Sequence, residues 1–104
     1  MTIQFNTDNN IIGSKLFTDP YIAQIEGELS RYSHQISRIE VHLSDEDGSK
    51  NGYGVIRCMI EARVEGLQPI SVTNHADTHN QAVGGAIDKL TSSLDTILGR
   101  LRNH

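Results

Sequence analysis

The chain has 104 residues, 37% hydrophobic and 21% charged, which is the composition of a globular protein and the length of one small domain. Acidic residues number 13 and Lys plus Arg 9, and the formal net charge of −4 argues against non-specific binding to DNA or another long polyanion. The sequence contains no apolar run near the ~20 residues that cross a bilayer, and no basic, then apolar, leader at its N-terminus. We therefore expect a cytoplasmic protein with no membrane partner.

The first predicted elements are a short strand and an amphipathic helix. Residues 3–5 alternate apolar and polar side chains, as a half-buried strand does. Asp19 is a suitable helix N-cap, and Pro20 suits the first helical position. The residues that follow predict a helix of about 14 residues. Its core-facing stripe is formed by Ile22, Ile25, Leu29 and Tyr32.

The middle of the chain predicts three strands in a meander. From Ile39 the apolar residues recur with a period of two, opposite Arg38, Glu40 and His42. Residues 55–65 alternate in the same way, with Arg57 and Arg63 on the face opposite the apolar one, and residues 70–73 follow as a further strand. Cys58, the only cysteine, falls on the apolar face, so we expect a buried and unreactive thiol.

The last predicted element is a long helix. It opens with Thr78-x-x-Gln81, the form of a capping box, and ends in Arg100, Arg102 and His104, where positive charge suits the helix dipole. The order β-α-β-β-β-α predicts one α+β domain over residues 1–104, a two-layer sandwich with both helices on one face of a four-stranded sheet. The expected core includes Ile39, Val41, Ile60, Ala62, Leu90 and Leu94.

Motifs that would carry chemistry are weak. His75-x-Asp77-x-His79 holds metal-ligand residue types, but histidines four apart share a face only on a helix, and the helix begins between them. Residues 45–48 resemble part of a calcium loop, yet Gly54 stands where the bidentate Glu would be. Gly84-Gly85 lies inside the helix and favours close packing rather than phosphate binding. We expect no catalytic residues, no metal and no cofactor.

Several segments carry a resemblance to a known family. They are Ile39–Leu43, Glu61–Gly66, and the helical pairs Ala82-Val83 and Lys89-Leu90 with Leu94. In order, length and register the chain resembles the short form of the ribosome hibernation promoting factors, also known as ribosome-associated translation inhibitors. The resemblance implies the β-α-β-β-β-α fold and binding near the messenger channel and decoding region of the small ribosomal subunit.

The resemblance implies a non-enzymatic protein that binds rRNA of the small subunit and inhibits translation or stabilises inactive ribosomes under stress, with no small-molecule substrate. The residues that we expect to contact rRNA phosphates are Arg57 and Arg63 on the sheet and Lys89, Arg100 and Arg102 on the last helix. Two alternatives stay open. One is a protein-interaction adaptor on the same fold without ribosome binding, and the other is a metal-dependent stress protein that uses His75, Asp77 and His79.

Overall fold

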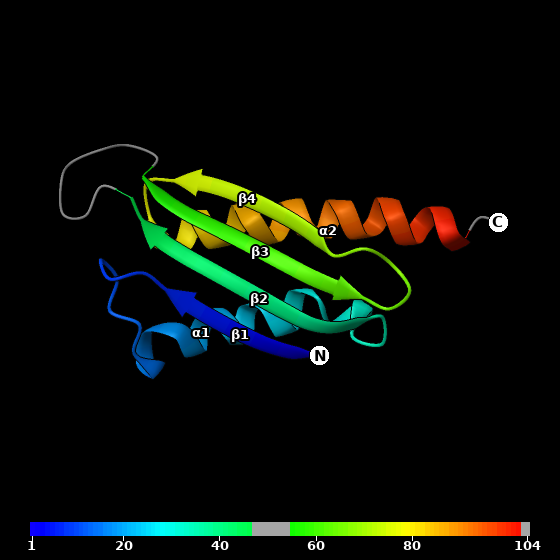
Figure 1. The fold of residues 1–104 in the computed structure, drawn as a ribbon, viewed down its shortest axis with the longest axis horizontal. Coiled ribbons are helices and arrows are strands. Elements are labelled where there is room, and N and C mark those ends of the chain that lie inside the picture. Colours follow the sequence, from blue (N-terminus) through cyan, green and yellow to red (C-terminus); the bar gives the residue numbers. More distant parts are fainter. Residues whose placement is uncertain (47–54, 103–104) are drawn as a thin grey trace.

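The computed structural model describes residues 1–46 and 55–102, with side chains up to residue 99. Along the chain lie β1 (Thr2–Thr7), α1 (Lys15–Glu28), the 3-10 turn η1 (Ser30–Tyr32), β2 (Ile36–Asp45), β3 (Ile56–Val64), β4 (Ile70–Ala76) and α2 (His79–Arg102) (Figure 1). This order confirms the predicted β-α-β-β-β-α arrangement.

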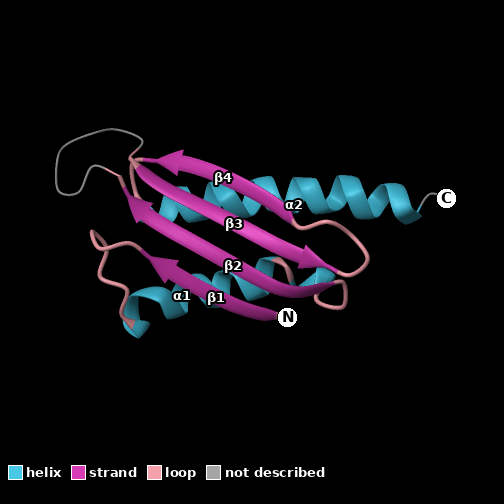
Figure 2. Ribbon diagram, viewed as in Figure 1, coloured by secondary structure: helices cyan, strands magenta, loops and turns pink. Residues whose placement is uncertain are grey.

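The four strands form one sheet in the order β1-β2-β3-β4. β1 pairs parallel to β2, and β2, β3 and β4 form the predicted antiparallel meander. Figure 2 shows both helices on the same side of the sheet, α2 along β3 and β4 and α1 nearer β1. Among the described residues no helix lies on the other face of the sheet, so the sheet has a covered face and an open face. No helix within the described ranges is long and apolar enough to cross a membrane.

The covered face contains the core. Ile39, Val41, Ile60 and Ala62 have no exposed surface, and neither do Leu90 and Leu94 of α2, which confirms the predicted register. A slip of one residue would have placed the arginines of β3 inside instead. Cys58 is also buried, and burial raises the pKa of its thiol to about 12, so the thiol is neutral and unreactive at physiological pH.

The first helix begins earlier than the sequence suggests. Ser14 is its N-cap, accepting a hydrogen bond from the Phe17 N–H at 3.3 Å, and Pro20 therefore lies inside the helix. Proline in a helix interior removes one backbone hydrogen bond, so another contribution must stabilise the extra turn. That contribution is aromatic packing: the Phe17 ring lies 5.4 Å from the ring of Tyr21, which stacks on Phe5 at 5.8 Å.

The core-facing stripe of α1 is also shifted. Tyr21, not Ile22, is buried beside Ile25, and Ile22 is only partly buried. The helix ends at Glu28, so Leu29 and Tyr32 are buried from the cap and from η1 rather than from the helix itself. The prediction placed the right apolar segment in the core but assigned the wrong bounds to its helix.

The second helix begins as predicted. The Thr78 hydroxyl accepts a hydrogen bond from the Gln81 N–H at 3.1 Å, the N-cap half of the predicted capping box. Gly85 allows close packing, since a Cβ there would lie 2.1 Å from Asn74 Nδ2, which donates to the Gln81 carbonyl at 3.2 Å. Gly84 has open space at the Cβ position, so only the second glycine is required by packing.

Candidate RNA-binding surface

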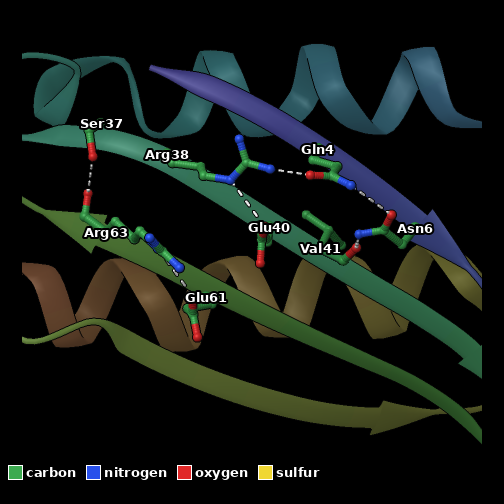
Figure 3. Close-up of polar contacts among 8 residues, drawn as sticks. All are labelled: Gln4, Asn6, Ser37, Arg38, Glu40, Val41, Glu61 and Arg63. Carbon is green, nitrogen blue, oxygen red and sulfur yellow. Dashed lines mark hydrogen bonds and ion pairs between the residues drawn. The ribbon is translucent and has the colours of Figure 1, made fainter.

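The open face of the sheet presents the charged residues of β2 and β3. Arg38 and Glu40 alternate outward along β2, and Glu61 and Arg63 do so along β3 (Figure 3). The register places Arg38 opposite Arg63 and Glu40 opposite Glu61. Like charges directly across a strand pair are destabilising, so this arrangement needs compensation from within each strand.

Ion pairs along the strands supply that compensation. Arg38 Nε lies 3.1 Å from Glu40 Oε1, and Arg63 Nε lies 3.7 Å from Glu61 Oε1. Figure 3 shows the two pairs side by side on neighbouring strands. Each arginine is thus partly neutralised by the glutamate two residues away. A phosphate that bound either guanidinium would have to compete with this carboxylate.

Arg38 is further fixed by an amide network that reaches the edge strand. It donates to Gln4 Oε1, and Gln4 Nε2 donates to Asn6 Oδ1 at 3.2 Å (Figure 3). Asn6 Nδ2 in turn donates to the Val41 carbonyl at 3.2 Å. The network ties β1 to β2 on the open face and orders the Arg38 side chain.

Arg57 lies at the other end of β3. Its Nε is 3.8 Å from Glu46 Oε1, the oxygen that also lies 3.4 Å from His75 Nε2. Arg57 and Arg63 are six residues apart on one strand, a separation of roughly 20 Å at 3.3 Å per residue. The structure therefore places these two predicted contacts on the same face but at opposite ends of it.

Lys89 belongs to the helical layer, not to the open face. Its Nζ donates to the Thr73 carbonyl at 2.8 Å, which fixes the ammonium against β4. Arg100 and Arg102 lie in the last turns of α2, and their side chains are outside the described residues. The five predicted contacts consequently do not form one patch.

A different grouping is evident at one end of the molecule, where β2 begins and β3 and α2 end (Figure 1). The Glu65 N–H donates to the Gln35 carbonyl at 2.9 Å, which brings the end of β3 against the turn before β2. Arg31 of η1 reaches α2 through Asp95, with Nη2 3.1 Å from the carboxylate. We define the arginine end as Arg31, Arg38 and Arg63 together with the last turns of α2 that carry Arg100 and Arg102.

Sequence reasoning did not select Arg31 or Arg38 as contacts. Arg31 falls within the first helix as the sequence predicts it, since Tyr32 belongs to the predicted stripe, whereas Arg31 lies in η1, after α1 has ended. Arg38 was recognised as outward-facing, but its place opposite Arg63 follows from the strand register, which the alternation pattern does not fix. No local pattern in the sequence groups these residues, because Arg31 and Arg38 are placed by tertiary contacts, the Arg31–Asp95 pair and the register of β2 on β3.

The candidate metal residues point to different neighbours. His75 faces Glu46 on the open side of the sheet, while the His79 ring packs edge-on against Phe17 with ring centroids 5.2 Å apart. Across the described residues no group of three or more His, Cys, Asp or Glu side chains is placed to hold a metal ion. The geometry gives no support to the reading based on His75, Asp77 and His79.

Comparison with solved structures identifies the fold. The N-terminal domain of Protein Y from Thermus thermophilus matches with a TM-score of 0.72 and 21% sequence identity, over 93% of this chain and 99% of that one. A ribosomal subunit interface protein from Coxiella burnetii matches with a TM-score of 0.67 and 17% identity, over 95% of this chain and 99% of that one. No protein-family model and no curated protein sequence matches the chain. The predicted resemblance in fold is thus confirmed over nearly the whole chain.

Proposed function

We propose that this protein binds the small ribosomal subunit and inhibits translation or stabilises inactive ribosomes under stress. The observation that carries the proposal is the match in fold, over more than 90% of this chain, to the N-terminal domain of Protein Y and to a protein named for the ribosomal subunit interface. The proposed action is occupation of an rRNA surface, without catalysis and without a cofactor. The proposed place of action is the cytoplasm, where ribosomes translate.

The arginine end is the best-supported contact surface for rRNA. At this end Arg38 and Arg63 lie opposite each other on the open face, and Arg31 pairs with Asp95 of α2 in the helical layer, so cations of both layers flank one end of the fold. Arg57 lies about 20 Å away at the opposite end of its strand, and Lys89 is already bonded to a backbone carbonyl. We therefore retain Arg63, Arg100 and Arg102 from the sequence-based set and add Arg31 and Arg38.

Sedimentation through a sucrose gradient tests the proposal. The full-length protein is mixed with purified small subunits at low salt and again at rising salt, and its position in the gradient is measured. We expect co-sedimentation at low salt and release as salt increases, because each phosphate contact displaces counterions. A protein that stays at the top of the gradient at low salt would refute the proposed function.

A matched pair of charge reversals tests the surface. Arg102→Glu lies at the arginine end and Lys15→Glu in the first turn of α1, at the opposite end of the molecule, and each changes the net charge by −2. We expect Arg102→Glu to weaken binding and to lower the slope of log affinity against log salt by about 1, and Lys15→Glu to change neither. Equal losses from both variants would show that only net charge matters.

The adaptor reading is favoured by one observation at the end of the molecule where the helices begin. Ile12 is 84% exposed and Leu16 is 91% exposed, and Leu16 borders a hollow of about 560 Å³ that Phe17, Pro20 and Tyr21 also line. Exposed apolar side chains beside a hollow suit a protein partner. If the subunits fail to bind but Leu16→Asp abolishes capture of a cellular protein that the unaltered chain retains, the adaptor reading replaces the ribosomal one.

A further inference from the structure

The side of α1 that faces away from the core is apolar as well. At 3.6 residues per turn, positions 16, 20, 23 and 27 lie within about 60° of one another around the helix axis, opposite the fully buried Ile25. All four residues are exposed, and Leu16 is exposed to 91%. A surface helix normally presents polar residues on this side, so an apolar one suits a partner. We define the outer strip as Leu16, Pro20, Ala23 and Gly27.

The outer strip is complementary in size to a reversed copy of itself. Its larger side chains, Leu16 and Pro20, lie in the N-terminal half of α1, and its smallest residues, Ala23 and Gly27, lie in the C-terminal half. The spacing is symmetrical, so a second α1 that lies antiparallel sets position 16 against 27 and position 20 against 23. A Cβ at Gly27 would meet nothing within 4 Å, so the space that Leu16 of a second copy would fill is open.

The charges beside the outer strip fit the same antiparallel arrangement. Lys15 and Glu26 lie on one flank of the strip, at opposite ends of α1. In a pair of antiparallel helices related by a twofold axis, each flank faces the same flank of the partner, and every contact occurs twice. Lys15 of one copy then lies within about 3 Å of the level of Glu26 of the other along the helix axis. The two copies would therefore form two symmetrical ion pairs.

Both charged groups are available for this pairing. The Lys15 side chain is 86% exposed, and its ion pair with Asp19, at 2.9 Å, is a solvent-exposed one that contributes little to the fold. Glu26 is exposed and has no ion pair or side-chain hydrogen bond within the described part of the chain. The Lys15 ammonium has three donors, so it can contact Asp19 and a second carboxylate together.

We propose that a second copy of this chain docks on the outer strip, so that two α1 helices pack antiparallel in a weak homodimer. The strip is about 21 Å long at 1.5 Å per residue, and a helix is about 10 Å wide, so the contact is smaller than a stable interface of ~1,200–2,000 Å². We expect a dissociation constant on the order of 10–100 µM. This inference does not rest on the proposed function.

Sedimentation velocity of the full-length protein tests for the dimer. Measured at low salt between about 1 µM and about 500 µM, the protein should change from monomer to mostly dimer. At about 1 µM the chain is monomeric, so binding to small subunits at that concentration is measured on monomers, and either proposal can fail without the other. A protein that is still monomeric at about 500 µM would overturn the dimer and leave the outer strip to a different protein.

Charge exchange tests the antiparallel register. Lys15→Glu and Glu26→Lys should each weaken the dimer about five- to tenfold, because two attractive pairs become two repulsive ones. The double variant, with both changes, restores the pairs in reverse and should regain the original dissociation constant within about twofold. The matched control is Glu28→Lys, which changes the net charge as Glu26→Lys does but lies on the other flank of the strip. Equal effects of Glu26→Lys and Glu28→Lys, or a double variant as weak as the singles, would overturn the proposed packing.

Gly27 offers a test that changes no charge. Gly27→Leu should abolish the dimer, because the new side chain would meet Leu16 of the partner, and it should not lower the melting temperature, because leucine favours the helix. The matched control is Gly84→Leu in α2, where a Cβ also meets nothing within 4 Å. A dimer that survives Gly27→Leu would place the contact elsewhere and refute the outer strip as its site.

Discussion

The two faces of the sheet are built by different forces. On the covered face, side chains such as Ile60 and Val41 are held by packing and have no exposed surface. On the open face, Arg38 and Arg63 lie opposite each other and are held by glutamates two residues along their own strands. Packing fixes a side chain through many neighbours, whereas an exposed ion pair fixes it through one and contributes little free energy. The covered face should therefore govern stability and the open face should tolerate change.

Adjacent residues of β3 give the most direct test of this difference. Ile60 is buried on the covered face, and Met59 is half-buried on the open face. We expect Ile60→Ala to lower the free energy of unfolding by about 2–5 kcal/mol, because it removes buried groups and leaves a cavity. Met59→Ala should cost less than about 1 kcal/mol. Urea denaturation measures both, and equal losses would contradict the comparison.

Asn74 is a polar side chain on the otherwise apolar covered face, and its position makes any substitution of Gly85 costly. Gly85→Ala would drive Asn74 from its bonds to the Gln81 and Ala82 carbonyls, a loss of about 1–3 kcal/mol that helix propensity only partly offsets. Gly84→Ala should instead stabilise the protein by up to about 1 kcal/mol. Thermal unfolding checks the two variants. In an Asn74→Ala background, Gly85→Ala and Gly84→Ala should change the melting temperature by the same amount, because the Asn74 side chain that a Cβ at position 85 would meet is gone.

The buried Cys58 thiol gives the covered face a pH dependence. Its pKa is raised from 9.0 to about 12 in the folded protein, chiefly by burial, so the unfolded chain releases this proton first. The free energy of unfolding should consequently fall as pH rises above about 9, by about 1 kcal/mol between pH 8 and pH 10. Urea denaturation at the two pH values measures the fall. Cys58→Ala should show a smaller decrease, and an identical decrease would assign the effect to other groups.

The smallest expected effect concerns the open face. Exchanging the charges of β3 with Glu61→Arg and Arg63→Glu keeps the net charge and the ion pair along the strand. It also turns both like-charge pairs with β2 into opposite-charge pairs. We expect a gain of about 0.2–1 kcal/mol that disappears at high salt. A loss of stability would show that the native order of charges is the better one for the fold.

The covered face and the open face also differ in how far the sequence predicts them. The alternation in β2 and β3 placed Ile39, Ile60 and Cys58 inside correctly, because a slip of one residue would have turned every apolar side chain of a strand to the open face. The start of α1 was wrong because Asp19 and Pro20 have the local form of a helix start. The packing of Phe17 and Tyr21 on Phe5 and His79 extends the helix past that signal, and these are contacts between distant segments.

The candidate site was predicted only in part, for a related reason. Residue type identified the arginines, but the meeting of η1, the start of β2 and the end of α2 depends on tertiary structure. Arg31 and Arg38 therefore joined the set only once the fold was known. The pairing of Arg31 with Asp95 joins residues 64 positions apart, and no local pattern predicts it.

Lys89 has a consequence for the behaviour of the protein at high concentration. β4 is a terminal strand of the sheet, and such a strand can recruit a strand from a second molecule and start aggregation. The Lys89 ammonium occupies the Thr73 carbonyl and places a positive charge along this border, which repels an identical molecule that approaches strand to strand. A polyanion that drew the Lys89 ammonium away would free the Thr73 carbonyl and remove the positive charge from the edge strand. This lysine therefore protects the protein from aggregation best when it takes no part in binding.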